Sequence, residues 1–238
     1  TGDQETARYT AVCDILWGSV LGNLPNVYTL IPKHGPGATA ERLSGNRKFT
    51  AIRWHDRLER FFPMLHNRFS SETAYNSKEF ENVTIVEPED EQPVRVIPVP
   101  KTLKGPRIIA IEPVCMQYAQ QAIAGALVPL LESHPITRGH VNFTDQSVNQ
   151  RLAMIASRNG KMATLDLSSA SDRVPLSLSM RMFDKAPDYQ GAIFACRSRR
   201  AEMPDGTLLH LGKFASMGSA LCFPIEAMYF YTLCIMAL

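Results

Sequence analysis

Cysteine is scarce in this sequence of 238 residues, and its five cysteines form no Cys-x-x-Cys pair. They are odd in number and scattered along the chain: Cys13, Cys115, Cys196, Cys222 and Cys234. This pattern argues against a disulfide framework and against a zinc site, and it favours a reducing compartment. The sequence also lacks a Gly-Lys-Ser/Thr triplet, so it contains no Walker-type phosphate loop.

A long apolar run is missing as well. A membrane-spanning helix needs about 20 predominantly apolar residues, whereas the apolar residues 227–238 form a shorter run that Pro224 and Glu226 keep from extending. We expect this run to be a buried helix and expect no membrane partner. The polar residues 1–5 lack Met and show no signal-peptide pattern, so we expect the sequence to be a piece of a longer protein.

No charge of one sign dominates, because the formal net charge is only +2. Composition alone therefore does not indicate a nucleic-acid-binding protein. The hydrophobic fraction of 45% is enough to bury one large core or two small ones. Apolar residues recur at helical spacing in residues 6–21, 54–69 and 117–131, which predicts three helices.

Two carboxylates six residues apart, Asp166 and Asp172, organise the most informative stretch, Ala-Thr-Leu-Asp-Leu-Ser-Ser-Ala-Ser-Asp-Arg-Val at residues 163–174. Residues 161–167 predict a short buried strand and residues 176–183 a helix. A strand, a carboxylate, a small turn and a second carboxylate can hold Mg²⁺, which prefers hard oxygen ligands. On these residues alone, a purely structural role is about as well supported. In that interpretation Asp166 caps a turn, and local backbone groups are hydrogen-bonded by the hydroxyls of Ser168, Ser169 and Ser171.

Residues 94–113 predict a second element, a two-stranded hairpin with a basic tip. Its cations are Arg95, Lys101, Lys104 and Arg107, against the single acid Glu112. Such a finger suits a polyphosphate, because Lys supplies point charge and Arg binds bidentately. An ordinary basic surface hairpin is the alternative.

A small-residue loop at residues 213–220 precedes the last helix, after a hairpin at residues 202–211 with an Asp-Gly turn. Ser216 and Gly218 allow close approach to a ribose or phosphate, and a helix N-terminus favours anions. The alternative is a simple helix cap by Ser216 or Ser219. Glu226, on the helix, needs a partner or a solvent-lined site.

Three further stretches have distinctive compositions. The glycine loop at residues 34–39 could approach a phosphate backbone or form an ordinary turn. The acidic residues 87–91 predict a solvated connector. A short basic cluster consists of Arg197, Arg199 and Arg200.

In their order along the chain, these stretches resemble one family, the catalytic (beta) subunit of the RNA-directed RNA polymerase of levivirus-like positive-strand RNA bacteriophages. Residues 100–113 resemble its basic nucleotide-entry motif, motif F. Residues 163–172 are similar to motif A, and residues 211–218 followed by Glu226 resemble motif B. The glycine loop resembles an upstream element, so the similarity begins at about residue 33.

The resemblance implies roles for these residues. Asp166 would bind catalytic magnesium ions, and Asp172 would recognise the incoming ribose with its 2′-hydroxyl. The triphosphate would be held by Lys101, Lys104 and Arg107. The ribose and template would be contacted by Ser216 and Gly218, with Glu226 at a helix position where related polymerases often carry Asn. The implied chemistry is two-metal phosphoryl transfer from a nucleoside triphosphate to an RNA 3′-hydroxyl.

The implied fold is α/β (α+β), a right-hand polymerase represented by its fingers and the first part of its palm, without the thumb. Residues 1–93 would form an N-terminal fingers region, residues 94–158 the fingers with the basic motif, and residues 159–238 a partial palm. Motif C, a Gly-Asp-Asp hairpin, is missing, since the only Gly-Asp lies at residues 2–3. We therefore predict that these residues alone do not synthesise RNA.

The implied partners are an RNA template and product and nucleoside triphosphates, in the cytoplasm of a bacterial host. Family members recruit elongation factors Tu and Ts and, in some cases, ribosomal protein S1, although no motif here indicates them. Two alternatives remain: a non-catalytic RNA-binding module, and another magnesium-dependent phosphoryl-transfer enzyme such as a phosphatase or a reverse transcriptase. A 2′-hydroxyl reader at Asp172 argues against the last.

Overall fold

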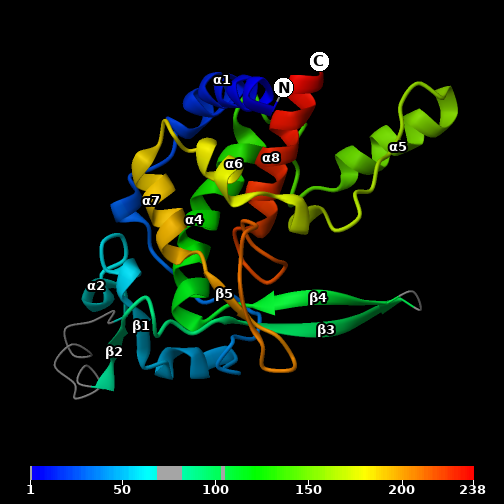
Figure 1. Ribbon diagram of the computed structural model, residues 1–238. Helices are drawn as coiled ribbons and strands as arrows, with labels where there is room; N and C mark the ends of the chain where they lie inside the picture. The colour runs from blue at the N-terminus through cyan, green and yellow to red at the C-terminus, as the bar shows by residue number, and fades with distance from the viewer. Residues whose placement is uncertain (1, 69–81, 103–104) are drawn as a thin grey trace.

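The computed structural model describes residues 2–68, 82–102 and 105–238. Figure 1 shows a helical body from which the β3–β4 hairpin and helix α5 project on the same side. The α-helices are α1 (Gly2–Leu21), α2 (Met64–Arg68), α4 (Val114–Ser133), α5 (Ser147–Asn159), α6 (Leu176–Arg181), α7 (Pro187–Cys196) and α8 (Cys222–Ala237). The strands are β1 (Arg53–His55), β2 (Thr84–Val86), β3 (Val94–Thr102), β4 (Gly105–Ile111), β5 (Arg200–Glu202) and β6 (Leu208–His210). The mixture of helices and sheets confirms the α/β class.

Helix α4 is the centre of the main core and packs against α7 and α8. Its buried side chains include Met116, Ile123, Leu127 and Leu131, each fully shielded from solvent. In the described part of the chain, α4 alone is long and apolar enough to cross a membrane by length and composition. Its burial at the centre of the core accounts for that composition equally well.

Helices α1 and α8 confirm two predicted helices and join the two ends of the described chain. Trp17 donates its indole N–H to the hydroxyl of Thr232 at 2.8 Å, and both side chains are buried. Tyr9 donates to the carbonyl of Leu178 at 3.1 Å. The predicted burial of the apolar C-terminal run is correct only in part: Met228, Tyr229 and Thr232 are buried, whereas Cys234 and Leu238 are exposed.

Both predicted hairpins are present in one four-stranded sheet of order β4-β3-β5-β6. The β3–β4 and β5–β6 pairs are antiparallel, and β3 lies parallel to β5 with Val94 opposite Ala201. The turn of the second hairpin places Gly206 at φ +85°, a conformation that favours glycine. A small second core lies under this sheet, formed by Val94, Val96, Ala110 and Ala201.

The predicted helix at residues 54–69 is wrong in type. Trp54 lies in β1, which pairs in parallel with β2, and a short 3-10 helix, η3 (Asp56–Leu58), follows. Pro63 interrupts any continuous helix because it lacks an N–H and restrains the residue before it, so α2 begins afresh at Met64. The apolar stripe is nevertheless mostly buried, as expected from its pattern, at Trp54, Leu58, Phe61 and Phe62. Phe69 lies outside the described residues.

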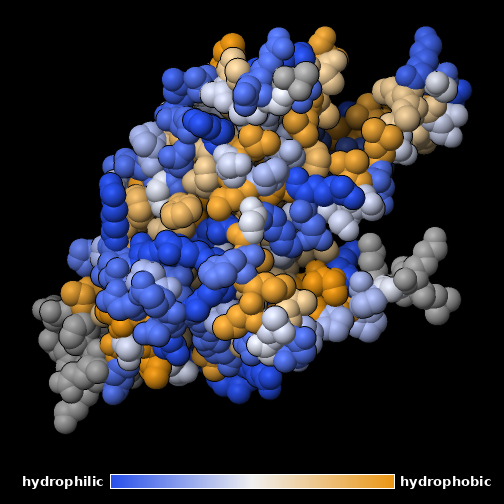
Figure 2. All heavy atoms as spheres, viewed as in Figure 1, coloured by the Kyte–Doolittle hydropathy of each residue, from blue (hydrophilic) through white to orange (hydrophobic). Residues whose placement is uncertain are grey.

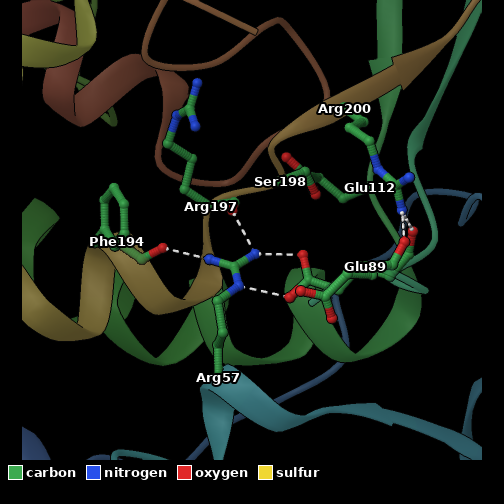
Figure 3. A network of polar contacts seen from close by, with 8 residues as sticks. Arg57, Glu89, Glu112, Phe194, Arg197, Ser198 and Arg200 are labelled. Carbon is green, nitrogen blue, oxygen red and sulfur yellow. Dashed lines mark hydrogen bonds and ion pairs between the residues drawn. The ribbon is translucent and has the colours of Figure 1, made fainter. Parts of the chain in front are cut away.

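The acidic connector is not a solvated loop throughout, because Glu91 is buried. Arg57 binds its carboxylate bidentately, with Nε–Oε1 and Nη2–Oε2 distances of 2.5 and 2.7 Å. Arg200 donates to the carbonyls of Glu89 and Glu91 at 2.9 and 2.6 Å. Figure 3 shows Arg57 also reaching the carbonyl of Phe194. A bidentate guanidinium offsets the desolvation of a carboxylate that composition alone would place in water.

A buried lysine binds the backbone carbonyls of the glycine loop near residue 35. Lys48 is buried and donates to the carbonyls of Gly35 and Gly37, and to Oε1 of Gln117 at 3.1 Å. The loop therefore presents these carbonyls to a cation of the protein itself, which favours the structural interpretation of this loop.

Candidate active site

The segment at residues 161–167 is exposed and has no regular secondary structure, so it is not the buried strand that its sequence predicts. Leu165 is 88% exposed, so the segment has no apolar cover. A strand forms only against a partner that accepts and donates its backbone hydrogen bonds. Within the described residues, neither sheet offers this segment such a partner.

Exposed apolar residues continue from this segment into helix α5. They are Leu152, Met154, Ile155, Met162, Leu165 and Leu167. Figure 2 shows apolar side chains gathered where α5 leaves the body. The backbone turns between helix and segment at Gly160, whose φ of +63° suits glycine.

Asp166 lies in this exposed segment, and in the described part of the chain its carboxylate has no hydrogen bond or ion pair. It therefore does not cap the following turn. That turn is η5 (Ala170–Arg173), entered through Ser169 at φ +53°. Its structure is held by backbone bonding, since the N–H of Asp172 donates to the carbonyl of Ser169 at 3.0 Å. The carboxylate of Asp166 thus remains available to a ligand.

Asp172 forms an ion pair with Lys213, which lies in the loop before α8. The two side chains are 53% and 25% exposed, so the pair lies at the surface and is open to a substrate. Backbone hydrogen bonds join the two segments that carry this ion pair. The N–H of Phe214 donates to the carbonyl of Val174 at 2.8 Å, and Pro175 and Lys213 form an antiparallel bridge.

Glu226 lies on α8 close to the same carboxylate. Partial burial raises the pKa of Glu226, and the negative charge of Asp172 raises it further. Cys222, one turn earlier on α8, has a pKa of about 12, raised by burial first and then by Glu226. The structure therefore brings Asp172, Lys213 and Glu226 together, although 41 residues separate the first two.

Arg197 is buried and supports the loop that carries Lys213. Its guanidinium donates to the carbonyls of Phe214, Leu211 and Lys213 at 2.6, 2.5 and 2.7 Å. Burial lowers its pKa to about 10, which leaves it charged at neutral pH. This member of the basic cluster therefore does not face solvent, because three backbone carbonyls replace its water.

Gly218 lies against strand β4 at the closest backbone approach in this loop. A Cβ at this position would lie 2.0 Å from the carbonyl oxygen of Ala110, and its φ is +125°. The N–H of Ala110 donates to the carbonyl of Met217 at 2.8 Å, so the loop is bonded to the base of the basic hairpin. Glycine is required here by both sterics and conformation.

The two serines of the loop have different surroundings. Ser219 is buried, donates its hydroxyl to Oε1 of Gln120 at 3.1 Å, and accepts the N–H of Leu221 at 3.3 Å. Ser216 is half-buried, and its carbonyl accepts the N–H of Ser219 at 3.2 Å. Neither serine caps α8, whose N-cap is Leu221 without a side-chain hydrogen bond. Ser219 instead joins the loop to α4 through Gln120, which leaves the Ser216 side chain for a ligand.

The basic hairpin is present, but only part of its predicted site is described. Arg107 is exposed on β4 opposite Val99. Arg95 donates to the carbonyl of Ala40 at 3.3 Å and so has a structural contact. Lys104 and the side chain of Lys101 lie outside the described residues.

Behind the loop, Glu112 is a fully buried acid at the end of β4. The hydroxyl of Ser198 donates to its Oε2 (Figure 3). Burial raises its pKa from 4.5 to about 7, against the opposing effect of hydrogen bonds from Ser198 and Gln120 and of the Arg197 charge. Its ionisation is therefore less favourable in the folded protein than in the unfolded chain.

We predict that Glu112→Gln flattens the pH dependence of stability. Because the folded-state pKa is raised, the native protein binds this proton more tightly than the unfolded chain. The contribution of Glu112 is then fully present below pH 4.5 and is lost as pH rises through about 7. As pH rises from 4 to 8, the unfolding free energy of the wild type should fall by about 3 kcal/mol relative to that of Glu112→Gln.

Urea unfolding at a series of pH values measures this difference. The matched control is Glu202→Gln, an exposed acid on β5, which should follow the wild-type curve. Parallel curves for wild type and Glu112→Gln would contradict the prediction.

The predicted magnesium site stays a prediction. Among the described residues, no group of three or more His, Cys, Asp and Glu side chains is placed to hold a metal ion. Asp172 is paired with Lys213 and Glu226 is disfavoured as an anion, so Asp166 is the carboxylate left for a cation. One carboxylate does not fit a complete two-metal site.

The sequence analysis did not assign three residues that hold the candidate site together: Lys213, Arg197 and Gln120. Each acts through a contact between distant segments. Lys213 follows a glycine in a basic, small-residue stretch, and this was the only signal available. The structure does not bring Arg107 into contact with Asp166 or Asp172; the hairpin instead joins the site through Ala110 and Gly218.

Comparison with known proteins identifies a family and several relatives of this chain. The sequence model of the family described as "RNA replicase, beta-chain" matches residues 74–237. The RNA-directed RNA polymerase subunit beta of Qbeta virus (strain MX1) is 34% identical over 139 residues, which cover 58% of this chain and 22% of the relative. The corresponding subunit of Enterobacteria phage SP is 34% identical over 136 residues, or 57% and 22% of the two chains. The beta chain of Escherichia phage MS2 is 33% identical over 138 residues, or 58% and 24%. The match thus spans less than a quarter of these relatives.

Proposed function

The chain belongs to the RNA replicase beta-chain family, and on that premise we propose that it forms the fingers and the first part of the palm of an RNA-directed RNA polymerase. The observation that carries the proposal is the joining of three separate segments at one site. The turn with Asp172, the loop with Lys213 and the helix with Glu226 meet there, and Gly218 connects them to the basic hairpin. All of these segments fall within the matched residues 74–237.

In this proposal the described residues bind and orient an incoming nucleotide. Lys213 holds one oxygen of Asp172, and the exposed carboxylate accepts a hydrogen bond from the ribose 2′-hydroxyl. Ser216 and Gly218 lie beside the ribose and template, and Glu226 forms the floor of the site. Positioning of this kind supplies much of the catalysis in phosphoryl transfer.

The triphosphate would be held by the cations of the hairpin, Lys101, Lys104 and Arg107. Magnesium, when bound, would neutralise charge on the reacting phosphates. Asp166 would supply one of its ligands, and the others would come from residues beyond those described here. The division into residues 1–93, 94–158 and 159–238 belongs to the same proposal.

The wider setting is also proposed from the relatives. A replicase of this family would bind an RNA template, its product and nucleoside triphosphates in the cytoplasm of a bacterial host. Elongation factors Tu and Ts and ribosomal protein S1 are candidate host partners. The remaining alternative is a non-catalytic RNA-binding module, which the exposed Arg107 hairpin also favours.

We predict that Asp172→Ala, in the complete polymerase that carries this sequence, lowers the preference for ribonucleotides over deoxyribonucleotides by about 10-fold or more. Loss of a hydrogen bond to a charged acceptor typically costs about 1.5–3 kcal/mol, and that cost falls on the 2′-hydroxyl substrate alone. The measurement compares template-directed incorporation of the two nucleotide classes.

Asp14→Ala is the matched control, since Asp14 also pairs with a lysine, Lys185, at 3.5 Å but lies on α1. It should keep the wild-type preference. An unchanged preference in Asp172→Ala would remove the ribose-reading role. Failure of the wild-type protein to copy RNA, or turnover of simple phosphate esters in its place, would overturn the proposed function itself.

A further inference from the structure

Glu112 is a buried acid for which the proposed polymerase chemistry has no use. It follows directly after β4 and is only 4% exposed. Its carboxylate accepts hydrogen bonds from the side chains of Ser198 and Gln120. An ionised carboxylate can only accept, so Gln120 donates to it through the amide nitrogen. The contact with Glu112 therefore determines which way round the amide of Gln120 lies.

The oxygen end of the same amide binds the loop that precedes α8. Oε1 of Gln120 accepts the hydroxyl of Ser219 at 3.1 Å and the backbone N–H of Ala220 at 3.2 Å. Nε2 also donates to the carbonyl of Cys196 at 2.8 Å. With Glu112 as the second acceptor at the nitrogen, every hydrogen-bonding position of the amide is used. Gln120 is 1% exposed, so solvent does not replace a lost partner.

A proton on Glu112 opposes this arrangement. The protonated acid carries an O–H, and a buried donor needs an acceptor. Of its two hydrogen-bond partners, Ser198 offers a hydroxyl oxygen and Gln120 offers Oε1, which already binds the loop. If the amide turned to accept this proton, its own N–H groups would face the N–H of Ala220. The hydrogen bond from Ala220 would then be lost.

Two arginines and two cysteines also face Glu112. The guanidinium groups of Arg197 and Arg57 favour its ionised form. Burial raises the pKa of the Cys196 thiol, and it raises that of Cys222 to about 12, so both thiols are neutral near pH 7. Burial lowers the pKa of Arg197 only to about 10. Glu112, with its pKa raised by burial to about 7, is therefore the member of this group that changes charge near neutral pH.

We propose that Glu112 is a positioning residue for nucleotide addition, which keeps the loop of Lys213, Ser216 and Gly218 in place through the amide of Gln120. The ionised carboxylate orients the amide, and the amide binds the loop at Ser219 and Ala220. This role rests on the proposed polymerase function, because the same loop carries the residues assigned to the nucleotide. We expect the loop to be bound more firmly above pH 7 than below it, since a charged acceptor binds its donor more strongly than a neutral one.

The test compares wild type and Glu112→Gln in the complete polymerase, with kcat/KM for a nucleoside triphosphate measured from about pH 6 to about pH 8.5. The ratio of wild type to variant should be close to one at about pH 6 and rise to about 10-fold at about pH 8, the difference between a charged and a neutral hydrogen bond. Glu202→Gln, the exposed acid on β5, is the matched control and should follow the wild type at every pH. An effect through stability alone has the opposite sign, because the stability of Glu112→Gln relative to the wild type rises with pH.

A second variant assigns the titration to Glu112. Ser198→Ala removes a hydrogen bond that favours ionisation and leaves Gln120 and the loop unchanged, so the midpoint of the pH profile should move to higher pH. An unmoved midpoint in Ser198→Ala would overturn the assignment.

Hydrogen exchange at the backbone N–H of Ala220 is a readout that needs no catalysis. Its protection should be about 10-fold greater in the wild type than in Glu112→Gln at about pH 8, and equal at about pH 6. Equal protection at both pH values would overturn the proposal, whether or not the protein synthesises RNA. Parallel pH profiles of an active wild type and Glu112→Gln would also overturn it and leave the polymerase function standing. A wild type that copies no RNA would instead overturn the polymerase function.

Discussion

Replacing Gly218 by Ala is expected to lower the free energy of unfolding by about 2–4 kcal/mol and RNA synthesis by about 100-fold. The added Cβ would lie 2.0 Å from the carbonyl oxygen of Ala110 and 2.8 Å from its carbonyl carbon, so backbone must move. The φ of +125° adds strain of about 1–3 kcal/mol for any other residue. A displacement of about 1 Å in a site that positions substrate can cost about 100-fold in rate.

Thermal unfolding and template-directed synthesis measure the two effects. The melting temperature should fall by roughly 5–10 °C for a chain of this size. Gly212→Ala is the matched control in the same loop, since a Cβ at Gly212 meets nothing within 4 Å. Wild-type activity in Gly218→Ala would show that the contact of this loop with β4 is unimportant.

The reason for the large effect lies in how the site is assembled. The loop of Gly218 is bonded to β4 at Ala110, to α4 through Gln120, and to Arg197 through three carbonyls. The same loop carries Lys213, which holds Asp172. Moving the loop therefore disturbs the hairpin and the carboxylate turn together.

Local signals predicted the local structure correctly. The Asp-Gly turn at residues 205–206 specifies the β5–β6 hairpin, and alternating β-branched residues specify β3 and β4. Helices α1, α4 and α8 follow from their apolar patterns. Most of the backbone bonding of these elements is local, although β3 also pairs in parallel with β5.

Elements that depend on distant partners were not predicted correctly. Residues 161–167 have the composition of a strand, but a strand needs a neighbour, and the described sheets give it none. Charge was misleading for the same reason. Glu91 belongs to an acidic stretch predicted to be solvated, yet it is buried against Arg57, 34 residues away.

The candidate site was predicted in its residue types but not in its contacts. The sequence indicated Asp172 and Glu226, and the structure brings them together. It gave no indication that Lys213 would pair with Asp172, since no local pattern links residues 41 apart. The roles of Asp166, Ser216 and Arg107 toward substrate stay predictions.

Asp166 offers the most informative substitution, because its role in stability and its role in chemistry can be separated. Its carboxylate is exposed and has no hydrogen bond or ion pair in the described part of the chain. Asp166→Asn should therefore leave the folded state intact, with a change in unfolding free energy within about 0.5 kcal/mol. If the carboxylate binds magnesium, the same change removes the charge that this binding needs.

The measurement that tests the central claim most directly is template-directed RNA synthesis by Asp166→Asn in the complete polymerase, with RNA affinity and melting temperature measured in parallel. Asp3→Asn, an exposed aspartate on α1, serves as the control and should be fully active. We predict that synthesis by Asp166→Asn falls by about 1,000-fold or more, since loss of one group that stabilises transition-state charge already costs about 100- to 1,000-fold. RNA affinity and melting temperature should not change. Synthesis by Asp166→Asn at the wild-type rate would contradict the polymerase assignment and favour a non-catalytic RNA-binding module.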